Sequence, residues 1–271
     1  MLEKCTQLKS RLEGGEKIYV AICTPLYGGV GMVDFFMSLM ETIVMLRSLG
    51  IGCEFFYLKY ESLIQRGRNT LCGLALNRPE VTHVFFIDGD IKWHPYDVLK
   101  LLNNDKQLVG GLYPKKNIMF DRMFSIENIL KIKDNKYNNG LTDEQIVKHH
   151  LVDYNLNFSD NKKINTDGTM EVKYIATGFM MIKREVFDKM KELHPEWAYE
   201  DDIHSGKEKI PNLYAYFDCF IHEGRYLSED WGFCERWRQC GGLVHADIMI
   251  PLTHIGTFNY EGRIMSTVRI D

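Results

Sequence analysis

Long hydrophobic runs and a strong excess of charge of either sign are both missing from this sequence of 271 residues. No stretch approaches the roughly 18–20 uncharged apolar residues that a membrane span requires. Lys and Arg number 33 against 37 Asp and Glu, a formal net charge of −4, so the basic excess typical of non-specific nucleic-acid binding is also lacking. The first 17 residues are charged and lack the apolar core of a signal peptide. We therefore expect a cytoplasmic protein with no transmembrane span and no nucleic-acid partner.

Paired cysteines are lacking too. The seven cysteines are an odd number, are irregularly spaced and include no Cys-x-x-Cys pair, so neither a disulfide framework nor a zinc site is expected. Hydrophobic residues, in contrast, make up 45% of the chain. That share supports a large packed core and excludes intrinsic disorder. At this length we expect one domain, residues 1–271.

Strand and helix patterns alternate along the first part of the chain. Short apolar runs predict buried strands, and longer stretches with apolar residues at helical spacing predict helices. The expected strands are 18–23, 53–58, 84–87 and 108–112, and the expected helices are 33–49, 61–77 and 95–102. The alternation favours an α/β protein: a single α/β/α, Rossmann-like domain with a mostly parallel central sheet. Ligands bind such sheets beyond the carboxyl ends of the strands.

The composition and the hydrophobic pattern change at residues 115–171. This segment is rich in Asn, Lys and Asp and shows little periodicity apart from a helix expected at 142–150. We interpret this segment as a variable insertion or an active-site lid. Regular patterns then return. The expected strands are 172–176, 178–183, 243–247 and 250–252, and the expected helices are 184–193 and 229–239.

The motif Asp88-Gly89-Asp90 follows the third expected strand directly. Two carboxylates one residue apart at a strand end suit a divalent cation that keeps open positions for phosphate oxygens. Because Asp and Gly also form ordinary turns, the motif by itself equally fits a plain strand-end turn. Its place at the ligand-binding edge of the predicted sheet favours the functional interpretation.

Several segments together resemble a known family. TPLYGG after the first strand, QRGRN on a helix, THVFFIDGDI, ATGFMMIKREVF and LSEDWGFCERWRQCGG follow one another in this order. The series resembles glycosyltransferases of the GT-A fold, with family-two-like enzymes as the nearest group and a fainter likeness to Anp1-type mannosyltransferases. The likeness covers residues 18–114 and 172–256 and leaves out 115–171. It implies a GT-A-like domain that transfers a sugar from a nucleotide-sugar donor to an acceptor hydroxyl.

The resemblance also implies roles for residues of the first half. Asp88 and Asp90 match the Asp-x-Asp motif, in which the second Asp binds Mn²⁺ or Mg²⁺ directly and the first reaches the ribose or the metal. Thr24 and Pro25 match the loop that holds the nucleotide. Arg68 matches an arginine on the helix before the motif, although by position alone it would be an ordinary helix-surface charge. These residues define an expected nucleotide-sugar-binding half, 18–114, for a UDP- or GDP-sugar.

The second half, 172–271, is expected to carry the acceptor side and the chemistry. Asp230 matches the catalytic base of inverting members, with Glu229 beside it, and His254 matches a late histidine that completes the metal shell. The residues allow other interpretations: Ser228-Glu229-Asp230 also indicates a helix N-terminus, where carboxylates are stabilised, and a lone His in an apolar run is often structural. The implied acceptor is a glycan or another hydroxyl compound.

Two other functions stay open. Gly28-Gly29-Val30-Gly31 lies between a strand and a helix, as in a dinucleotide-binding oxidoreductase that uses NAD(P). The turn lacks the third glycine of that motif, and Asp34 would oppose a pyrophosphate. A non-catalytic nucleotide- or carbohydrate-binding module is the third possibility, and the complete set of acidic residues together with His254 argues against it.

Overall fold

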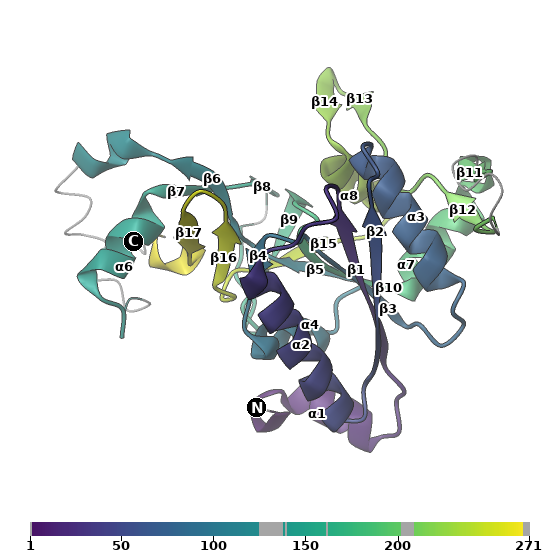
Figure 1. Ribbon diagram of the computed structural model, residues 1–271, viewed down its shortest axis with the longest axis horizontal. Coiled ribbons are helices and arrows are strands. Elements are labelled where there is room, and N and C mark those ends of the chain that lie inside the picture. The colour runs from purple at the N-terminus through teal and green to yellow at the C-terminus, as the bar shows by residue number, and fades with distance from the viewer. Residues whose placement is uncertain (1, 125–137, 139, 161, 202–208, 268–271) are drawn as a thin grey trace.

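A computed structural model describes residues 2–124, 138, 140–160, 162–201 and 209–267. Its centre is an eight-stranded sheet (Figure 1). The strands of this sheet are β1 (Tyr19–Leu26), β2 (Gly52–Lys59), β3 (His83–Ile87), β5 (Leu108–Gly111), β8 (Leu156–Phe158), β9 (Thr169–Ile175), β10 (Phe179–Lys183) and β15 (Val244–Asp247). Their order across the sheet is β2-β1-β3-β10-β5-β15-β9-β8.

The sheet confirms the α/β class but is mixed rather than mainly parallel. Three neighbouring pairs run parallel, β1 with β2, β1 with β3, and β15 with β5. Four run antiparallel: β10 with β3, β10 with β5, β15 with β9, and β8 with β9. The insertion of β10 between β3 and β5 breaks the parallel order. Its apolar side chains are buried on both faces of the sheet, and such a run looks the same in either direction.

Helices cover both faces of the central sheet. The α-helices are α1 (Thr6–Glu13), α2 (Val33–Ser48), α3 (Ile64–Leu76), α4 (Pro95–Asn104), α6 (Asp143–His150), α7 (Arg184–Leu193) and α8 (Glu229–Gln239). The 3₁₀ turns are η1 (Leu2–Lys4), η2 (Phe120–Phe124), η4 (Pro195–Trp197) and η5 (Ile264–Ser266). The core residues of α3, α7 and α8 belong to one buried cluster, and those of α1, α2 and α4 belong to another. Since successive strand residues point to opposite faces, the two clusters lie on opposite sides of the sheet.

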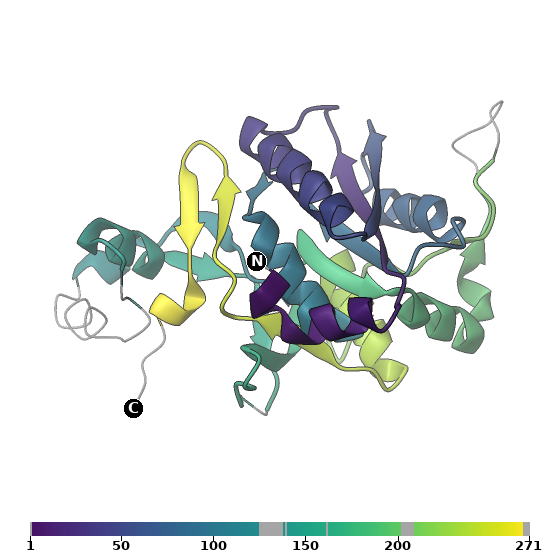
Figure 2. The ribbon, with the colours of Figure 1, turned by 90° about the horizontal axis from the view of Figure 1, so that it is seen from below.

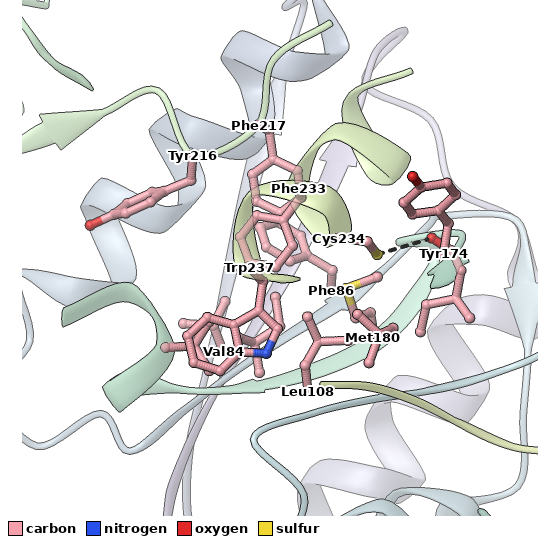
Figure 3. Close-up of a cluster of buried hydrophobic side chains, with 14 of the residues drawn as sticks. Val84, Phe86, Leu108, Tyr174, Met180, Tyr216, Phe217, Phe233, Cys234 and Trp237 are labelled. Carbon is pink, nitrogen blue, oxygen red and sulfur yellow. Dashed lines mark hydrogen bonds between the residues drawn. The ribbon is translucent and has the colours of Figure 1, made fainter. Parts of the chain in front are cut away.

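The cluster under α8 fixes the start of that helix against the sheet (Figure 3). Phe233 of α8 stacks on Phe217, with ring centroids 4.4 Å apart, and Phe217 contacts Phe86 of β3 edge-on at 5.2 Å. Trp237 is 1% exposed in the same cluster. Aromatic packing of this kind holds the N-terminus of α8 at a defined place beside β3.

A second group of strands lies beside the central sheet. The three-stranded sheet is formed by β4 (Ile91–Lys92), β16 (Leu252–Ile255) and β17 (Asn259–Gly262), and a two-stranded sheet by β6 (Pro114–Ile118) and β7 (Val152–Tyr154). Helix α6 contacts β17 and η5. Figures 1 and 2 both show this group on the opposite side of the molecule from α3 and α7.

The remaining strands form two short hairpins, and the inserted segment is only partly described. The hairpins are β11 (Ala198–Tyr199) with β12 (Leu213–Tyr214) and β13 (Phe220–His222) with β14 (Arg225–Leu227). Segment 115–171 contains β6, η2, α6, β7 and β8, which is more regular structure than its composition predicts. Residues 125–137, 139 and 161, on which much of the predicted lid falls, lie outside the described part.

Each strand and helix expected from the sequence overlaps an observed element. All seven cysteines are free thiols, in agreement with the expectation of no disulfides. Within the described ranges, every helix is too short or too polar to cross a membrane.

Candidate functional site

The carboxyl ends of β1 and β3 border a cleft of about 530 Å³. Its walls come from the loop after β1, the beginning of α3, the turn at 88–90 and Glu229 at the start of α8. The two strands are parallel neighbours, so their carboxyl ends lie at the same edge of the sheet. This is the edge at which ligands bind in α/β proteins and at which the sequence places its Asp-Gly-Asp motif.

Backbone hydrogen bonds hold the Asp-Gly-Asp turn from two sides. The Asp88 N–H donates to the carbonyl of Gly178 (3.0 Å), and the Met32 N–H donates to the carbonyl of Gly89 (2.9 Å). A Cβ atom at Gly89 would lie 2.6 Å from Leu26 Cδ2. Glycine at this position lets the Leu26 side chain pack closely against the motif.

Arg68 is a buried cation at the floor of the cleft, with its side chain 5% exposed. Its Nη2 donates to Asp88 Oδ1 (3.1 Å) and its Nε donates to Glu229 Oε1 (3.4 Å), while the guanidinium lies 5.5 Å from the centre of the Phe86 ring. Burial lowers the pKa of Arg68, but the two carboxylates raise it by more, so the pKa lies above its ordinary value and the charge is kept. Nη1 is buried and has no hydrogen-bond partner among the described residues.

Asp90 makes a separate set of contacts. Its Oδ2 accepts a hydrogen bond from Lys116 Nζ (2.6 Å) and lies 3.4 Å from His254 Nε2. His254 Nδ1 donates to the carbonyl of Pro114 (2.8 Å), which places a proton on Nδ1. Nε2 therefore either carries a second proton toward Asp90 or offers its lone pair to a cation shared with that carboxylate. Burial raises the pKa of Asp90, but His254 and Lys116 lower it by more, so the carboxyl group is more acidic than an ordinary Asp.

Asp90 and His254 have the donor chemistry for a divalent cation. Two ligands bound about 2.1 Å from one ion lie roughly 3.0–3.4 Å apart, which matches the separation of Asp90 Oδ2 and His254 Nε2. In the part of the chain that the structure describes, no group of three or more His, Cys, Asp or Glu side chains could hold a metal ion. Asp88, expected as a third ligand, is paired with Arg68. Among the described residues, Asp90 and His254 could therefore supply two ligands, and a bound ion would complete its shell with water or ligand oxygens.

Asp230 lies in the first turn of α8, whose N-cap is Ser228, as the sequence predicts. It is 8% exposed. Its Oδ1 accepts hydrogen bonds from the Ser228 hydroxyl and from the Trp231 N–H (2.8 Å), and its Oδ2 accepts one from Asn155 Nδ2 (3.4 Å). Burial and the neighbouring charge of Glu229 raise the pKa of Asp230 above its ordinary value, against the hydrogen bonds at the helix start. Asp230 is thus a better proton acceptor than an exposed Asp.

Tyr113, which follows β5, lies between Gly178 and His254. Its Oη accepts a hydrogen bond from the Gly178 N–H (3.2 Å), and its ring packs edge-on against His254 with centroids 5.1 Å apart. A Cβ atom at Gly178 would lie 2.5 Å from Tyr113 Oη and 2.6 Å from Asp88 Oδ2. Burial and the charge of Asp88 raise the pKa of Tyr113 well above its ordinary value, so the hydroxyl stays neutral.

The structure brings most of the predicted site residues together. Those that line the cleft are Pro25, Arg68, Asp88, Asp90 and Glu229. His254 reaches the cleft through its contact with Asp90. Thr24 does not line the cleft: it is fully buried in β1 behind Gly89, and its hydroxyl has no partner within the described residues. Asp230 also stands apart from the lining residues, with its carboxylate turned toward Asn155.

Sequence reasoning did not identify Tyr113, Lys116 or Asn155. A signal existed for the first two, because Tyr-Pro-Lys-Lys follows the fourth expected strand and lies at the same edge as the Asp-Gly-Asp motif. Asn155 joins two three-residue strands, β7 and β8, within a segment that has no clear periodicity. Nothing in its local sequence indicates contact with Asp230.

Comparison of the sequence with known protein families and with curated proteins finds no match. Among solved structures, the chain is similar to A197 from STIV, with 16% sequence identity, a TM-score of 0.46, and coverage of 88% of this chain and 86% of that chain. It is also similar to HddC from Yersinia pseudotuberculosis, with 13% identity, a TM-score of 0.31, and coverage of 83% of this chain and 98% of that chain. Both likenesses are distant, and the functional argument below rests on the site itself.

Proposed function

We propose that the protein is a metal-dependent glycosyltransferase of the GT-A type that transfers a sugar from a nucleotide-sugar to an acceptor hydroxyl with inversion. The observation that carries the proposal is that two charged groups meet in one cleft at the carboxyl ends of parallel strands. Arg68, paired with Asp88 and Glu229, supplies a buried cation, and Asp90 with His254 supplies a pair of metal ligands. An arginine and a metal ion are both groups that neutralise phosphate charge, so the pair suits a nucleoside diphosphate.

The donor would occupy the cleft. Its volume of about 530 Å³ fits a nucleotide-sized ligand, and Pro25 with the loop behind it forms one wall. Arg68 lines the cleft and keeps its positive charge, which supports contact with a phosphate or ribose oxygen of the donor. Asp88 orients Arg68 and is within the same cleft for contact with the ribose.

Asp90 and His254 would hold the Mn²⁺ or Mg²⁺ ion, with Asp88 in support. When bound, a divalent ion would neutralise the negative charge that develops on the leaving diphosphate. The Pro114 carbonyl fixes the His254 ring and leaves Nε2 as the ligand atom. Of the two candidate ions, Mn²⁺ is favoured by an imidazole ligand.

Asp230 would act as the general base. The acceptor hydroxyl attacks the anomeric carbon, its proton passes to the Asp230 carboxylate, and the bond from the anomeric carbon to the diphosphate oxygen breaks in the same step. Oδ2 is the oxygen available for the proton, because Oδ1 already accepts two hydrogen bonds. A raised pKa suits this task. Asn155 belongs to segment 115–171, which supports the placement of that segment on the acceptor side.

The test is a turnover screen over UDP-, GDP- and dTDP-sugars with and without Mn²⁺, together with calorimetry of UDP and GDP. We expect metal-dependent hydrolysis or transfer with one donor and an inverted product by proton NMR. A retained configuration would remove Asp230 from the role of base. Absence of turnover together with absence of binding for all donors would favour a non-catalytic module.

Among the residues that the structure describes, no contact supports the oxidoreductase alternative. A pyrophosphate at the start of α2 would meet Asp34, which lies in the first turn and pairs with Lys92 (2.8 Å). Calorimetry with NAD under the same conditions separates the two functions, since the oxidoreductase requires NAD binding and the glycosyltransferase does not.

A further inference from the structure

Lys116 of β6 makes the shortest contact to the proposed metal ligand. Its Nζ lies 2.6 Å from Asp90 Oδ2, the same oxygen that lies 3.4 Å from His254 Nε2. The Lys116 stem runs over Gly256, where a Cβ atom would lie 3.1 Å from Lys116 Cδ. The ammonium group therefore contacts the oxygen that a cation shared by Asp90 and His254 would use.

The Lys116 ammonium group and a divalent ion cannot both contact Asp90 Oδ2 at the same time. Lysine has three donors and no acceptor, so it repels a metal ion at contact distance. Lys116 must leave Asp90 when the ion binds. Its side chain is 36% exposed and carries a flexible four-carbon stem, so its ammonium group is free to swing away from the carboxylate.

The neighbouring Lys115 serves a different purpose. Its Nζ pairs with Asp153 Oδ2 at 2.9 Å, away from the Asp90 carboxylate. The chain thus provides two consecutive lysines, of which one contacts the proposed metal ligand and the other does not.

We propose that the Lys116 ammonium group neutralises Asp90 in the free protein. When a divalent ion binds the Asp90 carboxylate, this ammonium group moves to the phosphates of the nucleotide. This proposal rests on the proposed function, since it assumes the metal site and the nucleotide cleft. Under this proposal, the binding of the divalent ion and the binding of the nucleotide depend on each other. The ion competes with Lys116 when it binds alone, and the nucleotide diphosphate gives the displaced ammonium group a new partner.

The experiment is calorimetry with two probes, Mn²⁺ alone and then UDP or GDP at saturating Mn²⁺, on wild type, Lys116→Met, Lys115→Met and Lys116→Arg. For Lys116→Met we expect Mn²⁺ alone to bind on the order of three- to tenfold more tightly, and the nucleotide about tenfold more weakly. Lys115→Met removes the same charge one residue away and should leave both affinities within about twofold. Lys116→Arg should keep both close to wild type.

The opposite directions of the two changes distinguish this role from a structural one, because a damaged fold would weaken both ligands together. Weaker or unchanged Mn²⁺ binding in Lys116→Met would overturn the role of Lys116 while leaving the metal site intact. Unchanged nucleotide affinity in Lys116→Met would overturn the proposed contact of the Lys116 ammonium group with the phosphates. Failure of both the wild type and Lys116→Met to bind Mn²⁺, alone or together with UDP or GDP, would overturn the metal site and, with it, the role of Lys116.

Discussion

Replacing Arg68 by Met tests the electrostatic centre of the cleft. The substitution keeps a long apolar stem against Phe86 but removes the only charge that Asp88 and Glu229 share among their described contacts. Two carboxylates then remain close together in a poorly solvated place. We expect the variant to fold with reduced stability and to lose affinity for a nucleoside diphosphate.

The magnitude follows from burial. Removing one partner of a buried ion pair costs about 3–5 kcal/mol. Because the side chains of Asp88 and Glu229 are 27% and 14% exposed, we expect a smaller loss of roughly 2–3 kcal/mol in the free energy of unfolding. Arg66 provides the matched control. It lies on the same helix, is 40% exposed and pairs with Glu61, so Arg66→Met should cost about 0.2–1 kcal/mol.

The assay is urea denaturation at pH 7 for both single variants and for the triple variant Arg68→Met, Asp88→Asn, Glu229→Gln. The triple variant removes all three charges and should recover at least half of the lost stability, because the penalty comes from unpaired carboxylates. It should not recover nucleotide binding. An Arg68→Met variant as stable as Arg66→Met would refute the view that Arg68 is the counter-ion of the cleft.

Four further predictions concern the site. Asp230→Asn should lower turnover by about 10²- to 10⁴-fold while nucleotide-sugar binding stays close to wild type, as measured by steady-state kinetics and calorimetry. Burial and Glu229 raise the pKa of Asp230, so turnover should fall as the pH drops through that raised pKa. Glu229→Gln removes the like charge and should move this fall in turnover to lower pH. A pH–rate profile that Glu229→Gln leaves unchanged would contradict the role of Asp230 as the base. Removal of divalent ions with a chelator, or Asp90→Asn, should weaken UDP or GDP binding in calorimetry, whereas an unchanged affinity would exclude Asp90 as a ligand. Gly178→Ala should cost about 1–3 kcal/mol in thermal unfolding and reduce nucleotide affinity, because the new methyl group would lie 2.6 Å from Asp88 Oδ2.

Much of the sheet and its helices could be predicted from local sequence patterns. The apolar runs that became β1, β3 and β10 are short and mostly apolar, and the helices between them carry apolar residues at regular spacing. The direction of β10 could not be predicted, because a run buried on both faces carries no sign of its neighbours. The two- to five-residue strands β4, β6, β7 and β17 were also missed, since pairing with distant segments, and not local propensity, forms them.

The location of the site was predictable in the same way. Asp88 and Asp90 follow a buried strand, and strand ends of an α/β sheet meet at one edge. Their partners were less predictable. Arg68 pairs with Glu229 across 161 positions of sequence, and Asp90 meets Lys116 of β6 and His254 of β16, strands that belong to two further sheets. Such contacts depend on how these sheets lie beside the central sheet, which no local pattern records.

The charged triad of Arg68, Asp88 and Glu229 joins the two halves of the chain at the cleft. α3 supplies Arg68 from the first half, and α8 supplies Glu229 from the second. For stability alone, apolar residues of similar volume would serve as well or better, because three charges must be removed from water to form the triad. Buried groups that break the rules of core packing tend to mark functional sites. Arg68 lines a cleft that is large enough for a nucleotide, and under the proposed function a ligand with negative charge would account for an arrangement that stability alone does not explain.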